Sequence, residues 1–174
     1  KDNELHEELS WYGTFDDYLK IVKNNPLVGR NAFQRMYDMI NKAGFETYSD
    51  AKKDVQRYKF FADEAHGGND AVFGLDVPLM KLVNIIKSAA LGYGTEKRVV
   101  LLHGPVGSAK STICRMLKKG LEEYSRTKEG AMYTFDWIDE SGKLSEIFGK
   151  DVTVYKNPMH EDPLLLIPEE LRPR

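Results

Sequence analysis

Apolar residues recur at helical spacing in two segments near the start of the chain. The spacing of Phe15, Tyr18, Leu19 and Val22 predicts a helix. Thr14 is its expected N-cap, Asp17 lies in its acidic first turn, and Asn24-Asn25-Pro26 ends it. A second helix is predicted across Phe33–Ile40, with Gly44 just past its end.

Two longer helices are predicted further along. The first follows Phe73-Gly74-Leu75-Asp76, carries apolar residues from Leu79 to Ala90, and ends at Gly92. The second runs from Lys110 to about Ser125, and its inner stripe is formed by Ile113, Met116, Leu117 and Leu121.

Two strands are predicted around the last of these helices. The run Val99–Leu102 is apolar at four consecutive positions, which is typical of a strand buried on both faces. The segment Ala131–Trp137 is predicted as the next strand. The order helix–strand–loop–helix–strand predicts an α/β fold with a parallel sheet flanked by helices. We interpret residues 1–66 as a helical N-terminal extension and residues 67–174 as part of the α/β domain.

Composition and charge narrow the class of protein. Hydrophobic residues make up 41% of the chain and charged residues 30%, which suits a soluble protein with a core. The net charge of −2 gives no electrostatic basis for binding nucleic acid. No apolar run approaches the roughly 20 residues that a membrane span needs, so no membrane partner is expected. A single cysteine, Cys114, and no signal peptide favour the cytoplasm. The ends at Lys1 and Arg174 favour a piece of a longer protein.

The segment Gly104–Ser111 fits the phosphate-binding P-loop pattern G-x-x-x-x-G-K-[ST] except at one position. Successive backbone N–H groups of such a loop wrap a triphosphate. Lys110 is expected to neutralise the phosphates, Ser111 to ligate Mg²⁺, and the helix N-terminus to face the bound anion. Ala109 replaces the second glycine, and its Cβ is tolerated best where φ avoids strongly positive values.

Three alternative sites carry less weight. Asp139-Glu140 suggests the acidic Walker B motif, but Asp136 interrupts the apolar strand that the motif needs, so a solvated turn is favoured. Gly92-Tyr93-Gly94 has Lys97 where a dinucleotide fingerprint needs its third glycine. The four histidines, His6, His66, His103 and His160, lack metal-ligand spacing.

Several motifs together resemble the N-terminal AAA domain of the bacterial PrkA family of serine protein kinases, from about Phe15 to Pro168. They are Phe73–Asp76, Leu79–Val83, Lys87–Ala90, Gly104–Ser111, Lys119–Glu122, Tyr133–Phe135 and Asn157–Leu164. The resemblance implies a P-loop NTPase of the AAA+ type in a cytoplasmic bacterial protein. It also implies that the Walker B acids, sensor residue and arginine finger lie beyond Arg174, and that a kinase-like region follows.

The sequence therefore predicts a Mg-ATP-binding region of a protein that phosphorylates serine or threonine in a protein substrate. The expected ATP-binding residues are Gly104, Pro105, Val106, Gly107, Ser108, Ala109, Lys110, Ser111 and Thr112, with Phe73, Gly74 and Leu75 bordering adenine as in AAA+ ATPases. No catalytic residue is assigned. A AAA+ remodelling motor, working as a homo-oligomeric ring, and a non-catalytic nucleotide sensor remain alternatives.

Overall fold

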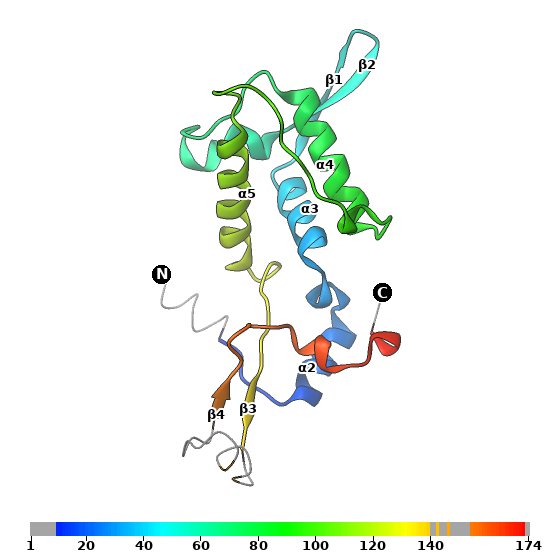
Figure 1. Cartoon of the computed structure of the whole chain (residues 1–174), viewed down its shortest axis with the longest axis vertical. Helices are drawn as coiled ribbons and strands as arrows, with labels where there is room; N and C mark the ends of the chain where they lie inside the picture. Colours follow the sequence, from blue (N-terminus) through cyan, green and yellow to red (C-terminus); the bar gives the residue numbers. More distant parts are fainter. Residues whose placement is uncertain (1–9, 140–141, 143–145, 147–153, 173–174) are drawn as a thin grey trace. The chain divides into compact units, whose positions relative to one another are not determined.

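The computed structural model describes residues 10–139, 142, 146 and 154–172 of the chain (Figure 1). The chain divides into two compact units, which are considered separately. The first unit is formed by residues 1–29 together with 131–174, and the second by residues 30–130.

Three helices and a β-hairpin make up the second unit (Figure 1). The helices are α3 (Ala32–Lys42), α4 (Asp76–Ala90) and α5 (Lys110–Ser125), and the hairpin strands are β1 (Phe45–Asp50) and β2 (Lys53–Tyr58). Short 3₁₀ turns, η2 (Lys59–Ala62), η3 (Glu64–His66) and η4 (Thr95–Lys97), complete it.

The core of the second unit lies between the three helices. Ile40 of α3 and Val83 of α4 are fully buried, and Met116 of α5 is 5% exposed. These residues belong to the apolar stripes that the sequence predicts. Helices α3, α4 and α5 also lie where three of the helices were predicted, and these predictions are confirmed.

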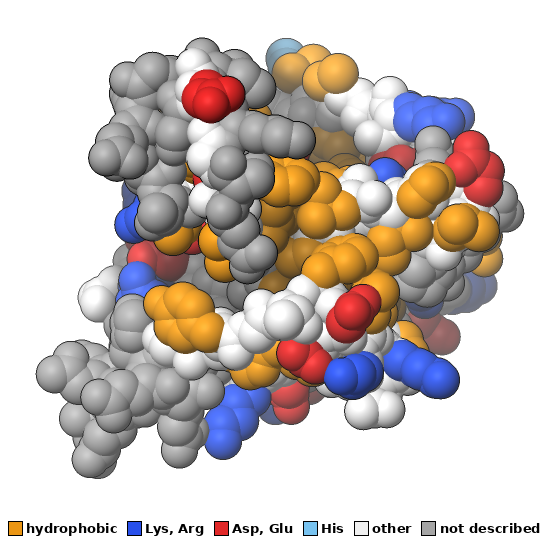
Figure 2. Space-filling model, turned by 90° about the horizontal axis from the view of Figure 1, so that it is seen from below, with side chains coloured by type: hydrophobic (Ala, Val, Ile, Leu, Met, Phe, Trp, Pro, Cys, Tyr) orange, Lys and Arg blue, Asp and Glu red, His pale blue; other side chains and the backbone are white. Residues whose placement is uncertain are grey.

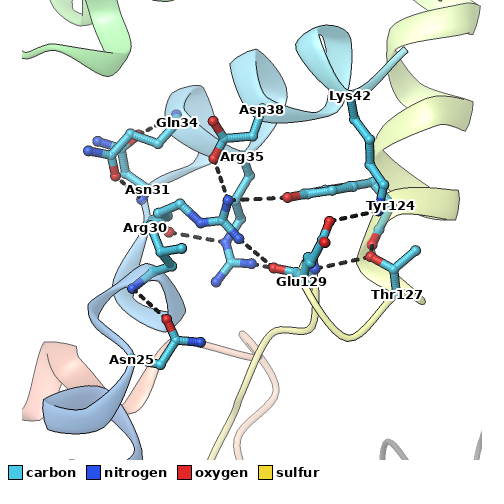
Figure 3. A network of polar contacts seen from close by, with 12 residues as sticks. Asn25, Arg30, Asn31, Gln34, Arg35, Asp38, Lys42, Tyr124, Thr127 and Glu129 are labelled. Carbon is cyan, nitrogen blue, oxygen red and sulfur yellow. Dashed lines mark hydrogen bonds and ion pairs between the residues drawn. The ribbon is translucent and has the colours of Figure 1, made fainter. Parts of the chain in front are cut away.

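A polar network ties α3 to the turn that follows α5 (Figure 3). The buried guanidinium of Arg35 donates from Nη1 to the carbonyl oxygen of Gly130 at 3.0 Å. Arg30 donates to the Tyr124 hydroxyl at 3.1 Å and also pairs with Asp38. Because these groups bridge segments far apart in sequence, they fix where α5 ends against α3.

The hairpin β1–β2 was not predicted from the sequence. Its strands pair antiparallel, with Phe45 opposite Tyr58 and Asp50 opposite Lys53. The two turn residues, Ala51 and Lys52, have φ of 47° and 64°, the backbone that two-residue hairpins use. Neither residue is the glycine or asparagine that signals such a turn, so the sequence carries no local indication of the hairpin.

The first unit holds helix α2 (Phe15–Asn24), strands β3 (Asp136–Ile138) and β4 (Val154–Lys156), and 3₁₀ turns η1 (Pro26–Gly29), η5 (Pro163–Leu166) and η6 (Glu169–Leu171). Thr14 caps α2 through a reciprocal capping box with Asp17, which confirms the predicted start of this helix. Tyr18 is buried against Leu164, and its hydroxyl donates to Asp162 at 2.8 Å.

The predicted strands are the main correction. Val99–Leu102 forms no strand, and Val99 and Leu101 are 95% and 81% exposed instead of buried. Of Ala131–Trp137 only the end is a strand, β3, and it pairs antiparallel with β4. Within the described residues the sheets are two antiparallel pairs, and the parallel sheet is not formed. A strand needs a neighbour for its N–H and C=O groups, and the described residues give Val99–Leu102 none.

Apolar side chains are exposed in both units, and Figure 2 shows exposed apolar side chains in orange. The most exposed include Phe73, Val99, Leu101 and Val106 in the second unit and Tyr12, Ile138, Met159 and Leu171 in the first. None of the helices in the described part of the chain is both long and apolar enough to cross a membrane.

Candidate phosphate-binding site

The loop Gly104–Ala109 is a tight turn that leads directly into α5. The amide of Ser108 donates to the Pro105 carbonyl at 3.4 Å, and the Ser108 hydroxyl donates to the same oxygen at 2.8 Å. A Cβ at Gly104 would lie 2.8 Å from the Ser108 hydroxyl oxygen, and Gly107 has φ of +81°. Gly104 therefore leaves room for the Ser108 hydroxyl, and Gly107 takes its left-handed backbone without the steric cost that a Cβ would bring.

Lys110, the first residue of α5, folds its side chain back across this loop. Its Nζ donates to the carbonyl oxygen of Gly104 and to the hydroxyl of Ser108, both at 2.9 Å, and to the carbonyl oxygen of Pro105. A cation at the positive end of a helix is unfavourable by itself. Three loop oxygens offset that cost here, so the ammonium is held against the loop.

Ala109 adopts a left-handed backbone conformation of the kind that glycine favours. Its φ and ψ are 56° and 12°, in the left-handed region. Its carbonyl accepts the amide of Ile113 at 2.9 Å, and its methyl group packs on the apolar core. The sequence left the effect of Ala109 on the loop open, and the observed φ is positive. Alanine therefore carries strain in an otherwise regular P-loop turn.

A cleft of about 810 Å³ runs along α5 beside the loop. Lys110 and Ser111 line its start, and Ser111 is exposed. The residues lining the rest are Val100, Leu102, Cys114, Arg115, Lys118, Lys119 and Glu122. Sequence reasoning missed the cations among them. Their spacing from Ser111, at four, seven and eight residues, is that of one helix face and was the available signal.

Phe73, Gly74 and Leu75 do not line this cleft. Phe73 is 83% exposed, and Gly74 has φ of +71°. Leu75 packs on the same apolar cluster as Ala109. The structure thus brings one end of this segment and one end of the P-loop onto a shared core, while the Phe73 ring points to solvent.

Arg115 links the P-loop helix to the chain just before Phe73. Its Nε donates to Asp70 Oδ2 at 3.1 Å, and its Nη2 pairs with the other carboxylate oxygen. The guanidinium lowers the pKa of Asp70. This forked pair joins residues 45 positions apart, so no local pattern predicts it.

Asp139 and Glu140 are the two acids considered for a Walker B motif. Asp139 is 8% exposed, and Glu140 lies outside the described residues.

A family model and a curated relative both relate this chain to PrkA proteins. The family model described as the PrkA AAA domain matches residues 13–174. The "ATP-dependent protease PrkA" of Bacillus subtilis is 40% identical over 173 residues, which cover 99% of this chain and 23% of that protein. An uncharacterized protein in the gldA 5' region of Geobacillus stearothermophilus is 42% identical over 83 residues, covering 48% of this chain and 74% of that protein.

A more distant likeness is to the human mitochondrial Lon protease homolog, at 24% identity over 168 residues, covering 95% of this chain and 16% of that protein. No solved structure gives a significant match. The chain spans about a quarter of the Bacillus subtilis relative, 23%. That relative is named as a protease, whereas the resemblance in the sequence implied a protein kinase.

Proposed function

The chain belongs to the PrkA AAA domain family, and on this premise we propose that it binds ATP through the loop Gly104–Ser111. The observation that carries the proposal is the position of Lys110, whose ammonium donates to three oxygens of the loop. The first N–H groups of α5 have no acceptors within the helix, and α5 begins at Lys110 itself. An anion with several oxygens is the ligand that this arrangement suits.

The roles of the residues follow from their chemistry. Lys110 exchanges its loop oxygens for phosphate oxygens, which accept stronger charge-assisted hydrogen bonds. The exposed hydroxyl of Ser111 is the proposed ligand of Mg²⁺, and the Phe73–Leu75 segment is the proposed border of the adenine.

Calorimetric titration of the 174-residue chain with ATP and Mg²⁺ tests the site. Lys110→Ala is expected to weaken binding at least about tenfold, or about 1.4 kcal/mol, because the phosphates lose their cation. Lys81→Ala, which removes an exposed lysine of α4, is the matched control and should leave the affinity unchanged. Equal affinities of wild type and Lys110→Ala would contradict the assignment.

The magnesium ligand has its own test. Affinity for ATP should be higher with Mg²⁺ than with a chelator, and Ser111→Ala should abolish most of that difference. A Ser111→Ala protein whose response to Mg²⁺ equals that of wild type would remove Ser111 from the metal site.

The parallel sheet is proposed for the longer protein. Val99–Leu102 is apolar, and in the described residues it has no strand beside it. Strands from the remaining sequence would supply the hydrogen-bond partners that this run needs. Amide exchange of Val99–Leu102 should then be slow in the longer protein and fast in this chain. Fast exchange in both would contradict the sheet.

The activity of the whole protein is a separate proposal. We propose that ATP bound here drives proteolysis of a protein substrate, because both the Bacillus subtilis relative and the more distant human relative are named as proteases. Phosphorylation of protein serine or threonine, implied by the family resemblance, is the alternative.

Incubating the longer protein with denatured casein and γ-labelled ATP separates the two activities. Acid-soluble peptides support proteolysis, and label on casein supports the kinase. ATP hydrolysis stimulated by casein without either product supports a remodelling motor, and ATP binding without turnover supports a sensor. The Lys110→Ala variant should abolish whichever activity is found.

A further inference from the structure

The segment Asp70–Asp76, here called the strap, joins η3 to α4 and carries Phe73 at its centre. Val72 is buried, and its amide donates to the carbonyl oxygen of Phe61 at 2.9 Å. The next residue, Phe73, is 83% exposed. The strap therefore holds its backbone against the core while presenting one aromatic ring to solvent.

The C-terminal end of the strap is fixed by the β1–β2 hairpin. Three donors converge on a single oxygen, Oδ2 of Asp76: Arg57 Nε at 3.0 Å, Arg57 Nη2 at 2.9 Å and the Tyr48 hydroxyl at 2.8 Å. The carboxylate is 13% exposed, and Arg57 keeps its pKa low. Arg57 also lies over the Tyr48 ring, 5.2 Å from its centroid.

The N-terminal end of the strap is fixed by the P-loop helix. Arg115 of α5 binds both carboxylate oxygens of Asp70, and the Asp70 amide donates to Asp63 at 2.9 Å. Arg115 lines the same cleft as Lys110, so this contact ties the strap to the helix that carries the P-loop lysine.

We infer that Arg57 and Arg115 are positioning residues, which hold the strap so that Phe73 receives the base of the nucleotide whose phosphates bind at Lys110. Ion pairs with exposed arginines contribute little to stability, and these two arginine side chains are 57% and 58% exposed. Their geometry has a clearer consequence. With both ends fixed, the loop that meets the base is ordered before binding, and less conformational freedom is lost when the ligand arrives.

The inference rests on the proposed function and predicts which part of the ligand is affected. The hairpin pair at Arg57 acts on the strap and leaves the P-loop alone. Its loss should weaken binding of ATP and leave binding of inorganic tripolyphosphate, which has no base, unchanged. A merely structural role would weaken both ligands together.

The experiment titrates the full 174-residue chain with each of these ligands in the presence of Mg²⁺. For Arg57→Ala we expect about a fivefold to tenfold loss of ATP affinity, with tripolyphosphate affinity within about twofold of wild type. Lys53→Ala, at the tip of the same hairpin, is the control and should change neither. Tyr48→Phe, which removes one donor to Asp76, should give a smaller loss of the same selectivity. It provides the test if Arg57→Ala fails to fold.

Two results would overturn the inference: unchanged ATP affinity in both hairpin variants, or an equal loss for ATP and tripolyphosphate. Either is distinguishable from failure of the proposed function, in which wild type binds neither ligand or Lys110→Ala binds both as well as wild type does. Asp70→Asn, which weakens the Arg115 anchor, should reproduce the selective loss of ATP affinity.

Discussion

At the scale of single residues, the loop Gly104–Ala109 contains two residues with a left-handed backbone, and only one of them is a glycine. Gly107 takes φ of +81° at no steric cost, whereas Ala109, two positions later, takes φ of 56° with a Cβ. The alanine holds this conformation because its carbonyl accepts the first hydrogen bond of α5 and its methyl group packs on the core. The loop therefore has a left-handed residue at position 109 although the second glycine of the sequence pattern is replaced by alanine.

Ala109→Gly is therefore expected to raise the free energy of unfolding by about 0.5–1 kcal/mol, because relief of left-handed strain exceeds the entropy cost of glycine. Urea denaturation measures the change. Gly107→Ala is the reciprocal control and should lower stability by a similar amount, since it places a Cβ at positive φ. A destabilised Ala109→Gly protein would show that Ala109 is not strained.

At the scale of elements, α3 and α5 meet where α5 has a glycine. Glycine costs about 1 kcal/mol in a helix interior relative to alanine, so Gly120 needs a packing reason. A Cβ there would lie 2.6 Å from Phe60 Cε2 and 2.9 Å from Met39 Sδ. The missing side chain lets α5 approach both α3 and the turn η2.

Gly120→Ala should lower the free energy of unfolding by about 1 kcal/mol, although alanine is the better helix former. An overpacked core costs about 1–3 kcal/mol, which exceeds the gain in helix propensity. Thermal and urea denaturation measure it, with Lys118→Ala on the exposed face of α5 as the control. An increase in stability would mean that propensity outweighs the contact with Phe60.

At the scale of the whole second unit, one histidine links the turn before the strap to α5. Nδ1 of His66 lies 2.7 Å from Asp63, and Nε2 lies 2.9 Å from Glu123. Hydrogen bonds to Asp63 and Glu123 raise the pKa of His66, against the smaller opposing effects of burial and of Lys119. Hydrogen bonds from the Asp70 amide and His66 keep the pKa of Asp63 low, so Asp63 stays ionised where histidine titrates.

The contribution of His66 to the stability of the chain should accordingly fall as the pH rises from about 6.5 through the folded pKa of His66. A group whose pKa is raised by folding stabilises the fold fully below its unfolded value, about 6.5 for histidine, and loses that contribution as pH passes the folded value. Urea denaturation across this range should show the advantage of wild type over His66→Gln shrinking towards high pH. An advantage that is constant or grows with pH would contradict the charged bridge.

The proposed site was predictable from the sequence only in part. Gly104, Lys110 and Ser111 identified the loop, because a phosphate-binding turn is a local pattern of glycines and one lysine. Arg57 and Arg115 were not predictable, since each acts on the strap through a partner 19 or 45 positions away along the chain. The backbone of Ala109 was left open by the sequence, because propensity alone disfavours an alanine at positive φ and does not say how the loop responds.

The sequence by itself determined the helices, their ends and the phosphate loop. Caps such as Thr14, apolar stripes and helix-ending glycines act over a few residues, so neighbours in the chain suffice to decide them. Tertiary structure decided the strands and the arrangement of the strap. A strand exists only beside another strand, so the apolar run Val99–Leu102 did not become one, whereas the unsignalled segments Phe45–Asp50 and Lys53–Tyr58 paired with each other. Likewise, the ion pairs that hold Asp70 and Asp76, at the two ends of the strap, exist only after distant segments have packed together.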